Sequence, residues 1–126
     1  MAEQYMFMIV EPDWDSDAYV GDTAGEQIAA EFPEFEAFER RVAELGATIV
    51  AGNALHNRRH GGTVVPGTDG REVDDAVWTD GASIESDEVI SGYYVVEAES
   101  EEIARQLAPL VPTGGHIEWR RIFPMG

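Results

Sequence analysis

The sequence predicts a single α+β domain in which helices cover one face of a mainly antiparallel sheet. Apolar residues recur at strand and helix periods in the order strand, helix, several strands, helix, strand. With 126 residues and 44% hydrophobic composition, the chain can build one core and is short for two. Residues 1–126 are therefore expected to form one domain.

The first strand is expected at residues 4–10, where the sequence QYMFMIV is almost continuously apolar. Such a run is typical of a strand that is covered on both faces or that lies at an interface. Residues 11–17 then interrupt the pattern with a proline and several acids, so a turn or loop is expected there.

The first helix is expected to end at Gly46, and its start depends on Pro33. Residues 23–26 have the spacing of a capping box, and apolar residues follow at helical spacing: Ile28, Phe32, Phe35, Phe38 (or Ala37), Val42 and Leu45. An internal proline loses a backbone hydrogen bond and collides with the preceding turn. Two alternatives stay open: a short turn ending at Phe32 with a helix from Pro33, or one kinked helix.

Further strands and one more helix are expected in the rest of the chain. Residues 47–55 and 93–98 have the composition of strands, and residues 63–65 and 73–78 flank the turn-rich sequence PGTDG, which suits a hairpin. Ser100 is a suitable N-cap for a helix that ends before Pro112. The last strand, residues 116–123, places Ile117, Trp119 and Phe123 on one side and His116, Glu118 and Arg120 on the other.

Acidic residues dominate the charge of the chain: 25 acids face 8 basic residues, all arginine, and the net charge is −17. This surplus repels phosphate backbones and anionic headgroups, so neither nucleic acid nor a membrane is expected as a partner. A well-solvated surface or a high-salt environment would each account for it. The sequence has no run of about 18 apolar residues and no signal-peptide pattern, so a cytoplasmic location is expected.

Two groups of polar residues are candidates for chemistry. His56 and His60 are four residues apart, but they follow a strand, and a metal site would need a third ligand from an acidic loop. A solvated loop is the favoured interpretation, and neither a metal nor a cofactor is expected. His116, Glu118 and Arg120 could line a cleft, although cross-strand charge pairing on an exposed or dimer-facing side of the sheet is favoured.

Residues 79–94, TDGASIESDEVISGYY, could form either a site or a simple connection. Asp80-Gly81 suits a tight turn, because aspartate caps its own backbone and glycine accepts a positive φ. The acids that follow lack the spacing of a calcium loop, so a solvated loop is favoured. Tyr93 and Tyr94 are adjacent in a strand and point to opposite faces, so only one of them can line a pocket.

The same segment resembles the signature of the YCII-related, DGPF-domain family, TDGPFAETKEQLGGYY, without a gap. The matching residues are Thr79, Asp80, Gly81, Glu85, Glu88, Gly92, Tyr93 and Tyr94. Shorter matches lie at Tyr5-Met6, at residues 52–55 (GNAL against GEAL) and at residues 117–120 (IEWR against VEVR). The resemblance implies a ferredoxin-like protomer in a dimeric α+β barrel, whose homodimer covers one sheet face and would account for the apolar first strand.

Departures from the family pattern bear on its chemistry. Ala82-Ser83 replaces the signature's Pro-Phe, and Asp87 replaces its lysine. In some relatives, a histidine on the first helix and an aspartate after the second helix resemble a proton-transfer dyad. The histidine position falls on Phe35 here and the aspartate position near Val111; neither residue carries an ionisable proton, so that chemistry is expected to be absent.

Three functions stay open, with the first slightly favoured. The first is a homodimeric protein that binds a small molecule in a cleft lined by Asp80, Tyr93 or Tyr94, Glu118 and Arg120. The second is an enzyme of that family class, a lyase or isomerase acting by proton transfer through His116 or Asp80. The third is a module that binds another protein through an exposed apolar patch.

Overall fold

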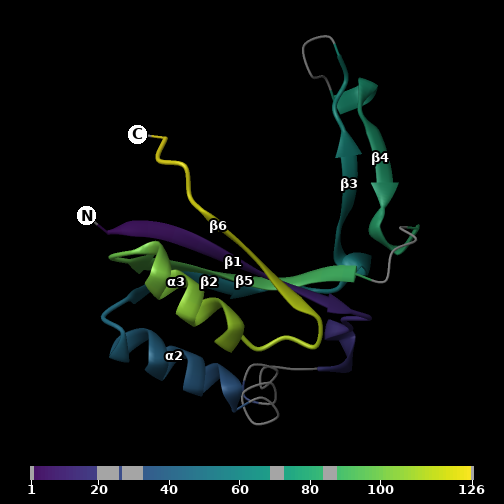
Figure 1. Ribbon diagram of the computed structural model, residues 1–126. Helices are drawn as coiled ribbons and strands as arrows, with labels where there is room; N and C mark the ends of the chain where they lie inside the picture. The colour runs from purple at the N-terminus through teal and green to yellow at the C-terminus, as the bar shows by residue number, and fades with distance from the viewer. Residues whose placement is uncertain (1, 20–25, 27–32, 69–72, 84–87, 126) are drawn as a thin grey trace.

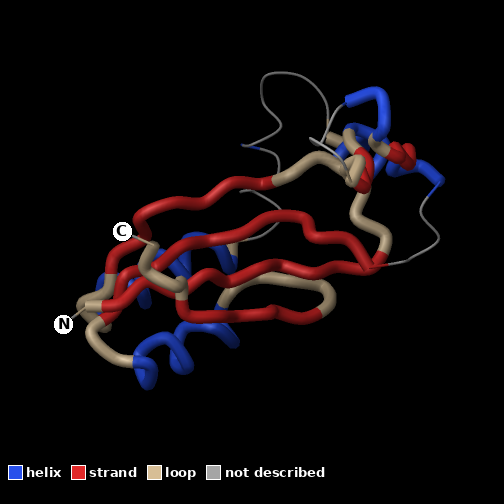
Figure 2. Tube along the Cα trace, turned by 90° about the horizontal axis from the view of Figure 1, so that it is seen from above, coloured by secondary structure: helices blue, strands red, loops and turns tan. Residues whose placement is uncertain are grey.

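A four-stranded antiparallel sheet forms the body of the protein. The computed structural model describes residues 2–19, 26, 33–68, 73–83 and 88–125. The sheet consists of β1 (Glu3–Pro12), β2 (Thr48–Ala54), β5 (Glu88–Ala98) and β6 (His116–Arg121), in the spatial order β2-β5-β1-β6. Figure 2 shows these strands side by side from above. The predicted first strand therefore lies inside the sheet.

Helices α2 (Glu34–Glu44) and α3 (Glu101–Leu107) lie on the same face of this sheet, as predicted (Figure 1). Together with the strand order, this arrangement is consistent with a ferredoxin-like fold. The start of α3 is the predicted one, because the Ser100 hydroxyl accepts a hydrogen bond from the Ile103 N–H at 3.3 Å. None of the helices in the described part of the chain combines the length and apolar character that a membrane span requires.

The start of α2 lies where one of the two predicted alternatives places it, at Pro33, while the short turn expected to end at Phe32 lies outside the described residues. Pro33 is its N-cap and Glu34 its first residue, and at this end of a helix a missing N–H costs no internal hydrogen bond. Gly46 follows the helix with a φ of 75°, which glycine adopts without strain. Residues 23–25 of the predicted capping box, together with Ile28 and Phe32, lie outside the described residues.

The core lies between the two helices and one face of the sheet. Tyr5, Phe7 and Ile9 alternate along β1 toward the helices and are at most 5% exposed. Phe7 meets Phe38 of α2 edge to face, with ring centroids 6.5 Å apart. The intervening residues of β1 point to the opposite face, which no helix in the described part of the chain covers (Figure 1). We call it the open face.

A second, two-stranded sheet of β3 (Gly62–Val65) and β4 (Val77–Asp80) projects away from the body (Figure 1). The sequence predicts this hairpin but starts its second strand at residue 73. Val73–Asp75 instead form a 3-10 turn, since consecutive aspartates favour turns over strands. Conversely, β5 begins well before the predicted residue 93, because it pairs with β1 as far as Pro12.

Candidate functional site

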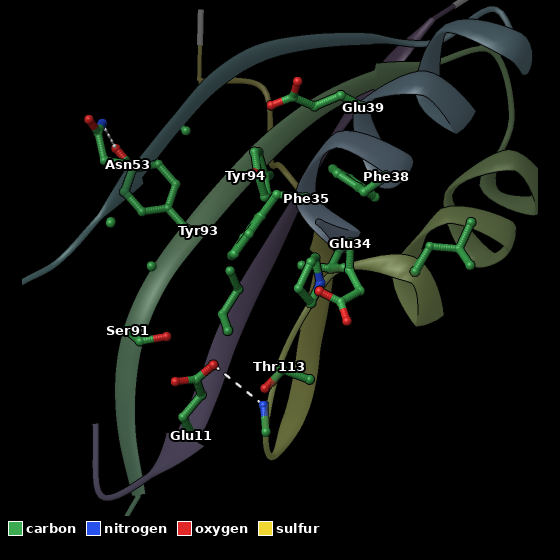
Figure 3. Close-up of a pocket in the computed structure, with 18 of the residues that line it drawn as sticks. Glu11, Glu34, Phe35, Phe38, Glu39, Asn53, Ser91, Tyr93, Tyr94 and Thr113 are labelled. Atoms are coloured by element: carbon green, nitrogen blue, oxygen red, sulfur yellow. Dashed lines mark hydrogen bonds between the residues drawn. The ribbon is translucent and has the colours of Figure 1, made fainter. Parts of the chain in front are cut away.

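A cavity of about 940 Å³ lies between α2, the chain that follows α3, and the sheet. Strands β1, β2 and β5 form its floor, α2 forms one wall, and residues 109–114 form another. The volume falls within the range typical of small-molecule sites. Figure 3 shows the rings of Phe35, Phe38 and Tyr94 between α2 and β5.

Helical spacing and one glycine position these aromatic rings. Phe35 and Phe38 are three residues apart on α2, so both face the sheet. Phe38 is 1% exposed, and its ring centroid lies 4.9 Å from that of Tyr94 on β5. A Cβ at Gly52 of β2 would come within 2.9 Å of the Tyr94 ring, so a glycine there lets the ring lie against the strand.

Carboxylates supply the charge of the cavity. Glu11 comes from β1, and Glu34 and Glu39 come from α2. One oxygen of Glu11 accepts a hydrogen bond from the Gly114 N–H at 3.4 Å, which joins β1 to the chain that follows α3. No arginine or histidine occurs among the described lining residues. The described wall is therefore apolar and negatively charged, which favours a neutral or cationic ligand over an anionic one.

Burial raises the pKa of the Tyr94 hydroxyl above its ordinary value, and the negative charge of Glu39 raises it further. Tyr94 consequently keeps its proton throughout the neutral range. Its hydroxyl can donate a hydrogen bond to a ligand there, but it cannot serve as a base.

Four of the six predicted site residues lie on the open face, away from the rings of the cavity. In the sheet register, Met8 lies between Tyr93 and Glu118, and Met6 is opposite Arg120. The Tyr93 hydroxyl accepts a hydrogen bond from the Asn53 side chain at 2.9 Å. His116 Nε2 and Glu118 Oε1 lie 4.0 Å apart, but both belong to β6, so this contact is not the cross-strand charge pairing that the sequence favoured.

The other two predicted residues lie elsewhere. Tyr94 faces the helices. Tyr93 borders the cavity, but its hydroxyl points to Asn53 (Figure 3). The two tyrosines therefore occupy opposite faces of the sheet, as predicted. Asp80 ends β4 in the projecting hairpin, where its carboxylate accepts a hydrogen bond from the Ala82 N–H at 3.0 Å. The aspartate cap is the predicted one, but Gly81 does not adopt the positive φ that the sequence predicted there. The six residues thus do not line one cleft.

Phe35 and Val111, the two positions that the family resemblance would assign to a proton-transfer dyad, both line the cavity. Neither side chain can move a proton. Phe38, Glu34 and Glu39 are not among the site residues predicted from the sequence. Helical spacing places Phe35 and Phe38 on one face, but it cannot distinguish a cavity wall from a filled core.

Comparisons with known proteins add no identification to this geometry. A scan against models of protein families finds no match, and a search of curated proteins finds none either.

Proposed function

We propose that the protein binds a small molecule, neutral or cationic and with an apolar body, in the cavity between α2 and the sheet. The observation that carries this proposal is the aromatic cavity of about 940 Å³ with Glu11, Glu34 and Glu39 in its described wall. An apolar body would gain from leaving water, at roughly 25 cal/mol for each Å² buried. A cationic group would gain from the carboxylates and from the faces of the aromatic rings.

Binding without catalysis fits the chemistry of the cavity better than proton transfer does. Phe35 and Val111, which the family resemblance would place at or near a proton-transfer dyad, cannot move a proton, and Tyr94 holds its proton more strongly than an ordinary tyrosine. His116 and Asp80, the candidate catalytic residues, lie outside the described lining of the cavity. The lyase or isomerase alternative would therefore need one of the carboxylates as its base.

A matched series of ligands tests the proposed binding. The series consists of phenethylamine, 2-phenylethanol and phenylacetate, which share a ring and differ in charge. Titrations followed by NMR should show the amine binding more tightly than the alcohol, with the acid weakest. Phe35→Ala should weaken amine binding roughly tenfold, which corresponds to about 1.4 kcal/mol. Phe123→Ala, a matched change at a side chain that is 77% exposed, should leave it unaltered.

Two results would contradict the binding proposal. One is that phenylacetate binds as tightly as phenethylamine, because the carboxylates of the cavity would then not discriminate between ligands by charge. The other is amine binding that is equally strong in wild type and in Phe35→Ala. Chemical shifts of α3 residues distinguish a folded variant from an unfolded one.

We also infer that the chain forms a homodimer through its open face, as in a dimeric α+β barrel. Apolar residues occupy the centre of that face: Met6, Met8 and Tyr93 are half-buried and adjoin in the sheet register, beside Val95, which is already buried at 8% exposed. The projecting hairpin adds Val65, Val77 and Trp78, which are 59%, 63% and 67% exposed. A second copy would remove these surfaces from water.

Net charge makes this dimerisation sensitive to salt. Two chains of charge −17 repel each other, and salt screens that repulsion. Light scattering should therefore show a dimer that weakens as the salt concentration falls. A monomer at every salt concentration would exclude the shared-sheet arrangement while leaving the ligand-binding cavity of each protomer intact.

A further inference from the structure

Two loops meet at the end of the sheet where β2 finishes. The first contains the 3-10 turn Ser16–Ala18, and the second contains the 3-10 turn Arg58–His60. Asn57 joins them, since its backbone N–H donates to the Ser16 hydroxyl at 2.8 Å and its side chain donates to Asp15 and Asp17. Asn57 is only 6% exposed, so the junction is a packed and hydrogen-bonded frame.

This frame brings two histidines and a carboxylate together. The rings of His56 and His60 stack with centroids 4.2 Å apart, and His60 Nε2 lies 2.8 Å from Asp17 Oδ1. One potential ligand atom from each of the three residues lies within 4.8 Å of the other two. The sequence favoured a solvated loop here, because two histidines four residues apart outside a helix are a weak metal motif. The third potential ligand, Asp17, lies 43 positions away from His60 along the chain.

We propose that Asp17, His56 and His60 bind a divalent transition-metal ion. Two imidazoles with one carboxylate suit Zn²⁺, Co²⁺ or Ni²⁺ better than Ca²⁺ or Mg²⁺, which prefer oxygen ligands alone. Three protein ligands leave at least one coordination position for water or another molecule. Both histidines also line a hollow of about 470 Å³, which provides room for that position.

Hydrogen bonds around the three residues have the arrangement of an outer shell. Asp17 Oδ2 accepts from the Asn57 amide at 2.8 Å and from Arg59 Nη2 at 2.9 Å, which fixes the carboxylate and directs Oδ1 to His60. His56 Nδ1 is hydrogen-bonded with the Ser16 hydroxyl at 3.0 Å, so Nε2 is left as the metal ligand. Metal-binding histidines typically divide their two nitrogens in this way.

Local charge also favours a cation. Arg59 is shared between Asp15 and Asp17, with both distances 2.9 Å, so two carboxylates meet one guanidinium. A dication bound beside Asp17 would be attracted by these two carboxylates and by the acidic surplus of the chain, against the positive charges of Arg59 and the neighbouring Arg58. Metal binding would take the place of the hydrogen bond between His60 Nε2 and Asp17 Oδ1.

Zinc titration by calorimetry and Co²⁺ absorption spectroscopy on the full chain test this site. Wild type should bind one ion per chain at the cluster, with the visible bands of nitrogen-ligated Co²⁺. His56→Ala and His60→Ala should each weaken Zn²⁺ binding by roughly tenfold to a hundredfold or more. His116→Ala, which removes the third histidine of the chain, should leave affinity and spectrum unchanged.

A second pair of variants tests whether the loss of one negative charge is enough to weaken Zn²⁺ binding. Asp17→Asn should lose the site, whereas Asp13→Asn, an equal charge change four residues away, should retain it. Equal affinities in wild type, His56→Ala and His60→Ala would overturn the proposal, and so would equal losses in Asp17→Asn and Asp13→Asn. His60→Gln keeps a polar side chain of similar reach; if it folds but binds Zn²⁺ as wild type does, the proposal also fails.

Discussion

The ring of Tyr94 tilts at 44° against that of Phe38, with centroids 4.9 Å apart, and this contact joins the centre of the sheet to α2. Phe38 also meets Phe7 of β1 edge to face. One helical side chain thus contacts both central strands. The same two rings border the cavity, so the packing that holds α2 on the sheet also shapes the candidate ligand site.

Phe38→Ala should lower the free energy of unfolding by about 3–5 kcal/mol, because it removes a buried ring and leaves a void between α2 and the sheet. Urea denaturation measures this loss. The matched substitution Phe123→Ala removes a ring that is 77% exposed and should change stability by no more than about 0.5 kcal/mol. Equal effects of the two substitutions would mean that α2 does not depend on Phe38.

Tyr94→Phe should make the protein less sensitive to alkaline pH. Burial and the charge of Glu39 raise the pKa of Tyr94 in the folded chain above its ordinary value of 10.0. As the pH rises above 10, the unfolded chain therefore loses this proton before the folded chain does. The stabilising contribution is therefore present below pH 10 and is lost as the pH rises through the folded pKa. Thermal melts of the two proteins from neutral to alkaline pH measure the difference. Identical pH profiles would show that Tyr94 titrates alike in both states.

Gly81→Ala should destabilise the base of the projecting hairpin. A Cβ at this position would overlap the carbonyl oxygen of Arg58, and the Gly81 N–H donates to the Gly61 carbonyl at 2.9 Å. Gly61→Ala is the matched control, because no atom lies within 4 Å of a Cβ built there. Hydrogen exchange of β3 and β4 should be faster in Gly81→Ala only. Equal exchange in both variants would mean that the backbone shifts freely to accept the methyl group.

Met8→Glu should convert the proposed dimer to a monomer. It would place a carboxylate between Tyr93 and Glu118 at the centre of the open face, where a second copy would exclude water. Light scattering at high salt measures the mass. Met125→Glu introduces the same charge at a side chain that is 89% exposed and should leave the dimer intact. If the Met8→Glu protein stays dimeric, the centre of the open face is not the dimer interface, and the projecting hairpin becomes the next surface to test.

Local sequence patterns determined the main elements of this protein and the direction of several side chains. The apolar run at residues 4–10 became β1, Ser100 capped α3, and Gly46 ended α2, because each feature depends on backbone preferences over a few residues. Alternation along a strand separated Tyr93 from Tyr94 for the same reason.

Only the tertiary structure decided which distant residues meet. Strand alternation defines two faces, but it was the packing of α2 and α3 that directed Tyr94 to the cavity and left Glu118 and Arg120 on the other side. His60 and Asp17 are 43 residues apart, and their contact depends on how the loops after β1 and β2 fold against each other. Such contacts arise from the pairing and packing of whole elements, which short-range patterns do not encode.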